Sequence, residues 1–186
     1  MFNNRRYSRL FLVIVVALIL VNTLINHQSS ATTLFNRSVV ISTAIPSAIA
    51  TYSFKFDVPT NSTIGSILFE YCSNTPSFYG TCIAPAGLDL SGANLASQTG
   101  NTGFSIDNTN STASTIVLTR PASAGNITSS SYTFDNVTNP SSAGTATYVR
   151  ISTHNTTDGS GPWQDTGAVA FATQSIFNVG RVWELR

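Results

Sequence analysis

Two cysteines are the residues whose type and spacing point most directly to chemistry. Cys72 and Cys82 are the only cysteines of the chain, and they enclose a short stretch with Asn74 and Pro76 that is typical of a turn. A pair this close is typical of a disulfide that closes a loop in an exported protein. The alternative is a reactive thiol, which would need a base, and His154 is the only histidine beyond the N-terminal segment.

Catalytic combinations are sparse. Ser152, His154, Asp158 and Asp165 supply the residue types of a Ser/His/Asp triad, but they fall in a turn-rich region where we expect an exposed histidine. The chain has no Gly-x-Ser-x-Gly, Ser-x-x-Lys or His-Glu-x-x-His motif and no phosphate-binding glycine loop. Its eight acidic residues are too scattered to single out a glycosidase pair. We therefore expect no enzymatic activity and no cofactor.

Oxygen-bearing side chains gather at residues 107–110 (DNTN) and at Asp135 and Asn136. Calcium prefers such ligands, but neither run has the spacing of a known calcium loop. Asp and Asn side chains in turns usually bond their own backbone. We therefore expect no metal site.

Three aromatic residues, Phe78, Tyr79 and Trp163, fall in loops rather than in strands. Exposed aromatic rings in such places can stack against the faces of sugar rings, so these three are candidate ligand-binding residues. Aromatic side chains in Pro/Gly-rich loops often cover one end of the core instead, and that is the interpretation that the sequence favours.

The charge balance excludes nucleic acid as a partner. Charged residues make up 9% of the chain, and the net charge is +1. Arg5, Arg6 and Arg9 lie in the N-terminal segment, and the rest of the chain carries six positive and eight negative charges. Phosphate binding needs clustered Lys and Arg, whereas Lys55 is the only lysine and the other arginines are scattered.

Residues 1–31 have the order of a secretory signal: a basic start, an apolar run over residues 10–21, and a polar end at Ser29, Ser30 and Ala31. The apolar run is about 12 residues, or about 18 Å as a helix, against a hydrocarbon core of about 30 Å. Small residues at 29 and 31 suit signal peptidase, so we expect cleavage after Ala31. The alternative is an uncleaved membrane anchor through residues 10–25.

The body of the chain, residues 32–186, reads as a single β domain. Residues 51–58 alternate strictly, with four apolar side chains on one face and three polar ones, Lys55 among them, on the other. Further β-rich runs are separated by Asn, Gly, Pro and Ser clusters. They cover residues 38–42, 64–72, 103–106, 115–119, 132–137, 145–152, 168–173 and 177–182.

This pattern predicts an all-β, antiparallel, immunoglobulin-like β-sandwich, preceded by the hydrophobic signal or anchor helix. One exception is residues 88–96, where Leu88, Gly92 and Leu95 favour a short helical turn. Tyr148 could be the corner tyrosine of immunoglobulin-like domains, but Arg150 stands where the cysteine would follow. We therefore interpret Tyr148 as an ordinary strand residue.

Six runs of the body, taken in order, carry a resemblance to a known group of proteins. They are IGSILFEYC (64–72), GLDLS (87–91), GNTGFSI (100–106), YTFDNV (132–137), YVRIST (148–153) and DTGAVAFAT (165–173). Over residues 52–173 the chain resembles a group of exported, uncharacterised proteins from ultrasmall candidate-phyla (Saccharibacteria-like) bacteria. The resemblance implies a bacterial envelope or secreted β-sandwich, and it implies no reaction, ligand or catalytic residue.

Together these features predict a non-enzymatic secreted or cell-surface protein that acts as an adhesion module or as a subunit of an envelope layer or fibre. Its partner would be a component of the cell envelope or of a host surface, or further copies of itself. The membrane would be met only through the N-terminal segment. An extracellular carbohydrate-binding module is the alternative.

Overall fold

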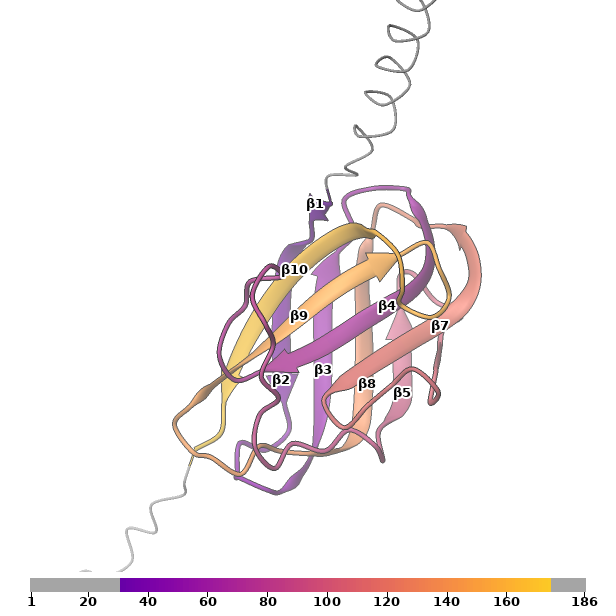
Figure 1. Cartoon of the computed structure of the whole chain (residues 1–186). Coiled ribbons are helices and arrows are strands. Elements are labelled where there is room, and N and C mark those ends of the chain that lie inside the picture. Colours follow the sequence, from indigo (N-terminus) through magenta and orange to yellow (C-terminus); the bar gives the residue numbers. More distant parts are fainter. Residues whose placement is uncertain (1–30, 175–186) are drawn as a thin grey trace, which may run out of the picture. The chain divides into compact units, whose positions relative to one another are not determined.

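The computed structural model describes residues 31–174, and Figure 1 shows the strands that they form. The expected leader up to residue 30 and the expected strand at 177–182 lie outside the described residues. In the described part of the chain, every regular element is a β-strand. No helix in residues 31–174 is long and apolar enough to cross a membrane.

Ten strands form two sheets, so the all-β, sandwich-like fold expected from the sequence is confirmed. The larger sheet has the order β1-β10-β9-β4-β7-β6, and the smaller has the order β2-β3-β8-β5. Only β1 runs parallel to its neighbour. The strands are β1 (Thr32–Thr33), β2 (Phe35–Ile41), β3 (Ile49–Asp57), β4 (Thr63–Cys72), β5 (Asn94–Thr99), β6 (Ser105–Ile106), β7 (Thr115–Ala124), β8 (Ser129–Thr138), β9 (Ala146–His154) and β10 (Trp163–Ala172).

Aromatic side chains fill the space between the sheets. Alternation in β3 turns its three aromatic rings inward and leaves Lys55 exposed, as predicted. The rings of Phe54 in the smaller sheet and Phe69 in the larger lie 4.9 Å apart, centroid to centroid. Seven aromatic residues are fully buried in this core: Tyr52, Phe54, Phe56, Phe69, Tyr71, Tyr132 and Phe134. Losing one such ring to alanine costs about 3 to 5 kcal/mol, so these rings hold the two sheets together.

The expected helical turn at residues 88–96 is wrong. Leu88 and Leu90 are both buried while Asp89 between them is exposed and bridges to Thr138 of β8, which is an extended arrangement. From Asn94 the chain forms β5, an edge strand paired with β8. Burial of alternate residues, Leu88 and Leu90, is the pattern of an extended chain. The spacing near 3.6 residues, on which the prediction of a helical turn was based, was weak by comparison.

The outer face of the larger sheet is largely covered by the chain itself. The register of β4 and β9 places Ser66, Leu68 and Glu70 opposite His154, Ser152 and Arg150. These six side chains point away from the core, because their neighbours Ile67, Phe69, Val149 and Ile151 point into it. Two connections, residues 73–83 after β4 and residues 155–162 after β9, fold back over this face. That is why β9 is buried on both faces along most of its length.

Candidate functional site

A depression of about 400 Å³ lies on the outer face of the larger sheet, between the two connections that cover it. Leu68, Ser152 and His154 form its floor, and Glu70 and Thr115 lie at one side. Phe78 and Trp163 form a wall. Each of these side chains belongs to an outward position of β4, β7 or β9, to the start of β10, or to the covering loops. The sandwich therefore provides a rigid base for a concave, partly aromatic site.

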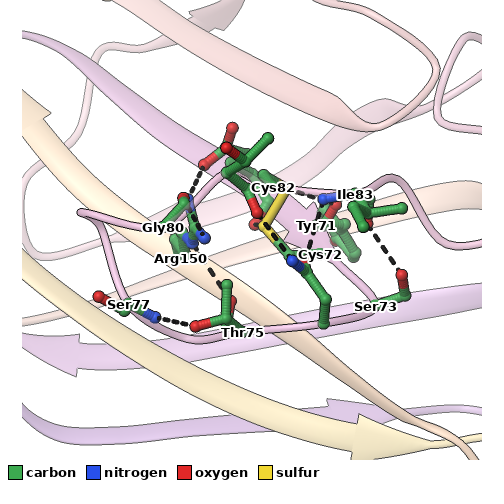
Figure 2. The surroundings of a disulfide bond; sticks show 12 residues. Tyr71, Cys72, Ser73, Thr75, Ser77, Gly80, Cys82, Ile83 and Arg150 are labelled. Carbon is green, nitrogen blue, oxygen red and sulfur yellow. Dashed lines mark hydrogen bonds and ion pairs between the residues drawn. A yellow bond between two sulfur atoms is a disulfide. The ribbon is translucent and has the colours of Figure 1, made fainter.

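The loop of residues 73–83, which carries Phe78, forms the first of two walls around the depression. A disulfide between Cys72 and Cys82 closes this loop, which confirms the predicted pairing (Figure 2). The two Cα atoms lie 5.1 Å apart, one at the end of β4 and the other where the loop returns. The loop also bonds to itself. Asn74 donates from Nδ2 to the carbonyl of Thr81 at 2.8 Å and accepts at Oδ1 from the backbone N–H of Ile83 at 3.0 Å.

Arg150 fixes this loop to the sheet from below. Its side chain is 4% exposed, and its Nη2 donates to the carbonyl of Gly80 at 2.9 Å while Nε donates to that of Thr75 at 3.3 Å. Figure 2 shows these contacts on either side of the guanidinium. Nη1 forms an ion pair with Glu70 at 3.2 Å. Charge-assisted hydrogen bonds of this kind are roughly twice as strong as neutral ones, so Arg150 sets the position of the loop that carries Phe78 and Tyr79.

The structure brings the three candidate aromatic residues together. The Phe78 and Trp163 rings lie 5.3 Å apart at 67° to each other, and the Tyr79 and Trp163 rings lie 6.1 Å apart at 79°. None of the three is among the residues of the core cluster or the partly buried residues packed against it. Tyr79 is 94% exposed, and its ring lies against Trp163, which lines the depression.

The second wall is the connection of residues 155–162, which lies directly on β4. A Cβ atom at Gly65 would come within 2.7 Å of the carbonyl oxygen of Thr156, so only glycine allows this approach. The hydroxyl of Ser66 donates to that same carbonyl at 2.7 Å and accepts from the backbone N–H of Gly159 at 3.1 Å. These contacts hold the second wall in place on β4.

His154 is buried, with 2% of its surface exposed, so the exposed histidine expected from the sequence is wrong. It ends β9 beneath the second wall, and its Nδ1 lies 3.1 Å from the carbonyl oxygen of Gly161. A carbonyl only accepts, so Nδ1 carries the proton and Nε2 accepts from the hydroxyl of Ser152 at 3.0 Å. Desolvation by burial lowers the pKa of His154 below its usual range.

No Ser/His/Asp triad is assembled from these residues. Asp165 turns to the other face of its strand and accepts from Thr153 at 2.8 Å and from Thr60 at 3.1 Å. Asp158 binds Ser160 within its own loop, and these hydrogen bonds lower the pKa of its carboxyl group to about 2. The imidazole of His154 therefore has a carbonyl and a hydroxyl as its partners rather than a carboxylate.

Of the two oxygen-rich runs, residues 107–110 form a turn, whereas Asp135 and Asn136 lie inside β8, where Asp135 accepts from the hydroxyl of Thr51 at 2.7 Å. Asp107 accepts at Oδ1 from the backbone N–H of Thr109 at 2.9 Å, and its other oxygen accepts from the side chain of Asn110 at 2.7 Å. Among the described residues, one group of three potential metal ligands lies close together: Glu70, Cys72 and Cys82. Two of these are the disulfide sulfurs, which cannot supply the thiolates that a metal needs.

Sequence reasoning identified the aromatic residues but missed the side chains that hold and line the site around them. Arg150 and Glu70 face each other across β4 and β9, and Leu68 faces Ser152. The one available signal was the alternation in two central strands, which predicts that these side chains point away from the core. That signal does not show whether water or a loop covers them, or which loop it is.

No protein-family model matches the chain, and no curated protein matches it. Two solved structures are similar in shape. A bacterial hydrophobin, BslA, has 13% sequence identity and a TM-score of 0.43 over 78% of this chain and 97% of its own. The collagen-binding domain from a Staphylococcus aureus adhesin has 14% identity and a TM-score of 0.35 over 77% of this chain and 99% of its own. At these TM-scores neither likeness carries an argument about function.

Proposed function

We propose that this chain is a non-enzymatic extracellular binding module that holds a glycan in the depression on its larger sheet. In this proposal the leader of residues 1–31 exports the chain, and the domain is an immunoglobulin-like sandwich. The glycan belongs to a cell envelope or to a host surface, so the protein acts as an adhesion module.

The observation that carries the proposal is the aromatic cluster of Phe78, Tyr79 and Trp163 at the edge of the depression. The first two come from the disulfide loop and the third from β10, so separate parts of the chain hold these rings at one place. A ring that is 94% exposed, as Tyr79 is, adds little to the stability of the fold. The C–H groups of a sugar face pack on such rings, while the sugar hydroxyls reach polar side chains beside them.

A glycan-array screen of the full-length chain tests this function. We expect a defined sugar ligand that binds the wild-type chain and is lost in Trp163→Ala. The matched control is Phe35→Ala, because Phe35 is also a partly exposed aromatic residue but lies on β2, away from the depression. Absence of glycan binding, or equal binding by the wild-type chain and Trp163→Ala, would contradict the proposal.

A further inference from the structure

The depression has a shape and a charge that narrow its ligand further. We infer that it takes a single, soluble, uncharged glycan chain, and that it discriminates against acidic glycans and against the flat faces of crystalline polysaccharides. This inference rests on the proposed function, and it concerns which class of glycan the site selects.

The ring geometry argues against a flat ligand. Both Phe78 and Tyr79 meet Trp163 nearly edge-on, at 67° and 79°, so neither ring lies in the plane of Trp163. A crystalline polysaccharide presents a flat face, which needs coplanar rings to contact several sugars at once. Phe78 and Trp163 instead line a hollow of about 400 Å³, into which the residues of a single chain can enter.

The charges around the hollow argue against an acidic ligand. Three ionisable side chains line it: Glu70, Arg150 and His154. Arg150 is 4% exposed and donates to Glu70, Thr75 and Gly80, so it has no exposed face for a carboxylate or sulfate. His154 is kept neutral by burial, which lowers its pKa. The side chain of Glu70 is 38% exposed, so the charge that a ligand meets most directly is negative.

The exposed hydrogen-bonding groups of the site call for a ligand that brings donors. Ser152 is 3% exposed and gives its proton to His154, so it is as little open to a ligand as Arg150. Glu70 has a carboxylate, which only accepts. Sugar hydroxyls can donate to Glu70 and accept from the hydroxyl of Thr115 beside it. An uncharged, hydroxyl-rich chain is therefore the chemical match.

Calorimetric titration of the full-length chain against three classes of probe tests the inference. The soluble neutral probes are the hexamers of cellulose, chitin, mannan, starch and xylan, the acidic probe is hexagalacturonate, and the insoluble probes are microcrystalline cellulose and chitin. We expect at least one neutral hexamer to bind, and hexagalacturonate to bind at least about tenfold more weakly. We expect no depletion of the protein by the crystalline powders.

The outcomes separate the inference from the function on which it rests. If the chain binds none of the probes and no sugar on the array, the proposed function fails. If it binds hexagalacturonate as tightly as the neutral hexamers, or binds the powders and no hexamer, the function stands and the inference is overturned.

Two variants test the charge and the ring separately. Glu70→Gln removes the carboxylate at nearly constant shape, so we expect the ratio of hexagalacturonate affinity to neutral-hexamer affinity to rise about tenfold. The control Asp57→Asn makes the same change of charge on the other sheet, and an equal gain there would overturn the inference. Tyr79→Ala, at an exposed position that the fold does not need, should weaken neutral binding about tenfold.

Discussion

The guanidinium of Arg150 lies beneath the disulfide loop and gives its hydrogen bonds to the carbonyls of Thr75 and Gly80 and to Glu70. A buried charge is tolerated only when it is paired in this way, so the loop cannot move off Arg150 without a large penalty. Because these contacts occupy the guanidinium, its positive charge is not open to a ligand in the depression. One residue therefore both positions the aromatic rings and removes the cation that an acidic sugar would need.

His154 leads to a pH prediction. In the unfolded chain its pKa is about 6.5, and burial lowers that pKa in the folded chain. Below about pH 6.5 the unfolded state therefore binds a proton that the folded state resists, and the free energy of unfolding falls as the pH drops. We expect the melting temperature to decrease from about pH 7 to about pH 5 and the decrease to be smaller in His154→Gln.

Differential scanning fluorimetry across this pH range checks the prediction. His154 is the only histidine among the described residues, and carboxyl groups with lowered pKa values, such as Asp158, stay ionised over the same range. A wild-type chain and a His154→Gln variant with the same pH slope would show that the imidazole is not the source.

Two core tyrosines give a matched pair of predictions. The hydroxyl of Tyr52 donates to Oδ1 of Asn139 at 2.6 Å, whereas the buried hydroxyl of Tyr71 has no partner among the described residues. We expect Tyr52→Phe to lower the free energy of unfolding by about 1 to 3 kcal/mol, because it leaves a buried amide oxygen unpaired. Tyr71→Phe should be neutral or stabilising, since it removes a desolvated hydroxyl that bonds to nothing.

Urea denaturation of the two variants measures both changes. The shape of the side chain changes equally in each, so the difference between them isolates the hydrogen bond. Equal destabilisation by Tyr71→Phe and Tyr52→Phe would mean that Tyr71 has a partner in solution.

At the scale of elements, the sequence predicted most strands because each half-buried strand carries a period of two that is local to it. Residues 51–58 show this clearly: the structure places residues 51–57 in β3 with the predicted face inward, and Val58, directly after the strand, is also buried. The error at residues 88–96 has the opposite cause. Before it becomes an edge strand, that stretch packs on the core through Leu88 and Leu90 and, less deeply, through Ala93, so its local pattern is too short to decide between the two periods.

The disulfide loop is an element whose stability can be measured apart from the core. The bond between Cys72 and Cys82 reduces the number of conformations open to the unfolded chain. For a ring of this size, this raises the free energy of unfolding by about 3 kcal/mol. We expect the double variant Cys72→Ser, Cys82→Ser to keep the fold and to melt roughly 6 to 12 °C lower, since the core residues are unchanged.

The same variant should bind glycan more weakly, because Phe78 and Tyr79 lie inside the ring that the disulfide closes. Thermal melts and the titration described above measure the two effects on one sample. A variant that melts like the wild-type chain would mean that the disulfide does not restrict the unfolded chain enough to stabilise the fold.

At the scale of the whole molecule, the site depends on contacts between distant parts of the chain. Phe78 meets Trp163 only because β4 and β9 are neighbours in the larger sheet and β10 continues from β9. Strand order of this kind is not written in any local pattern, so the sequence could identify three aromatic loop residues but not their common place. The buried roles of Arg150 and His154 follow from the same long-range pairing.

The start of the folded domain bears on how the chain is processed. Thr32 and Thr33 pair with Asp165 and Thr166 of β10, and the hydroxyl of Thr32 bonds to the carboxylate of Asp165. Leu34, two residues on, is fully buried. Cleavage after Ala31 would therefore leave β1 and Leu34 in place, whereas cleavage even three residues later would remove a strand and an anchor of Asp165.

We accordingly expect N-terminal sequencing of the exported protein to begin at Thr32. Signal peptidase reads the residues at the first and third positions before the cut, here Ala31 and Ser29. Ala31→Arg should block cleavage and keep chains that begin with Met1 in the membrane fraction, while the matched variant Ser30→Arg, at the position between them, should still be processed. Recovery of Met1 in the membrane fraction from the wild-type chain would instead make residues 10–25 an anchor and tether the binding module to the cell.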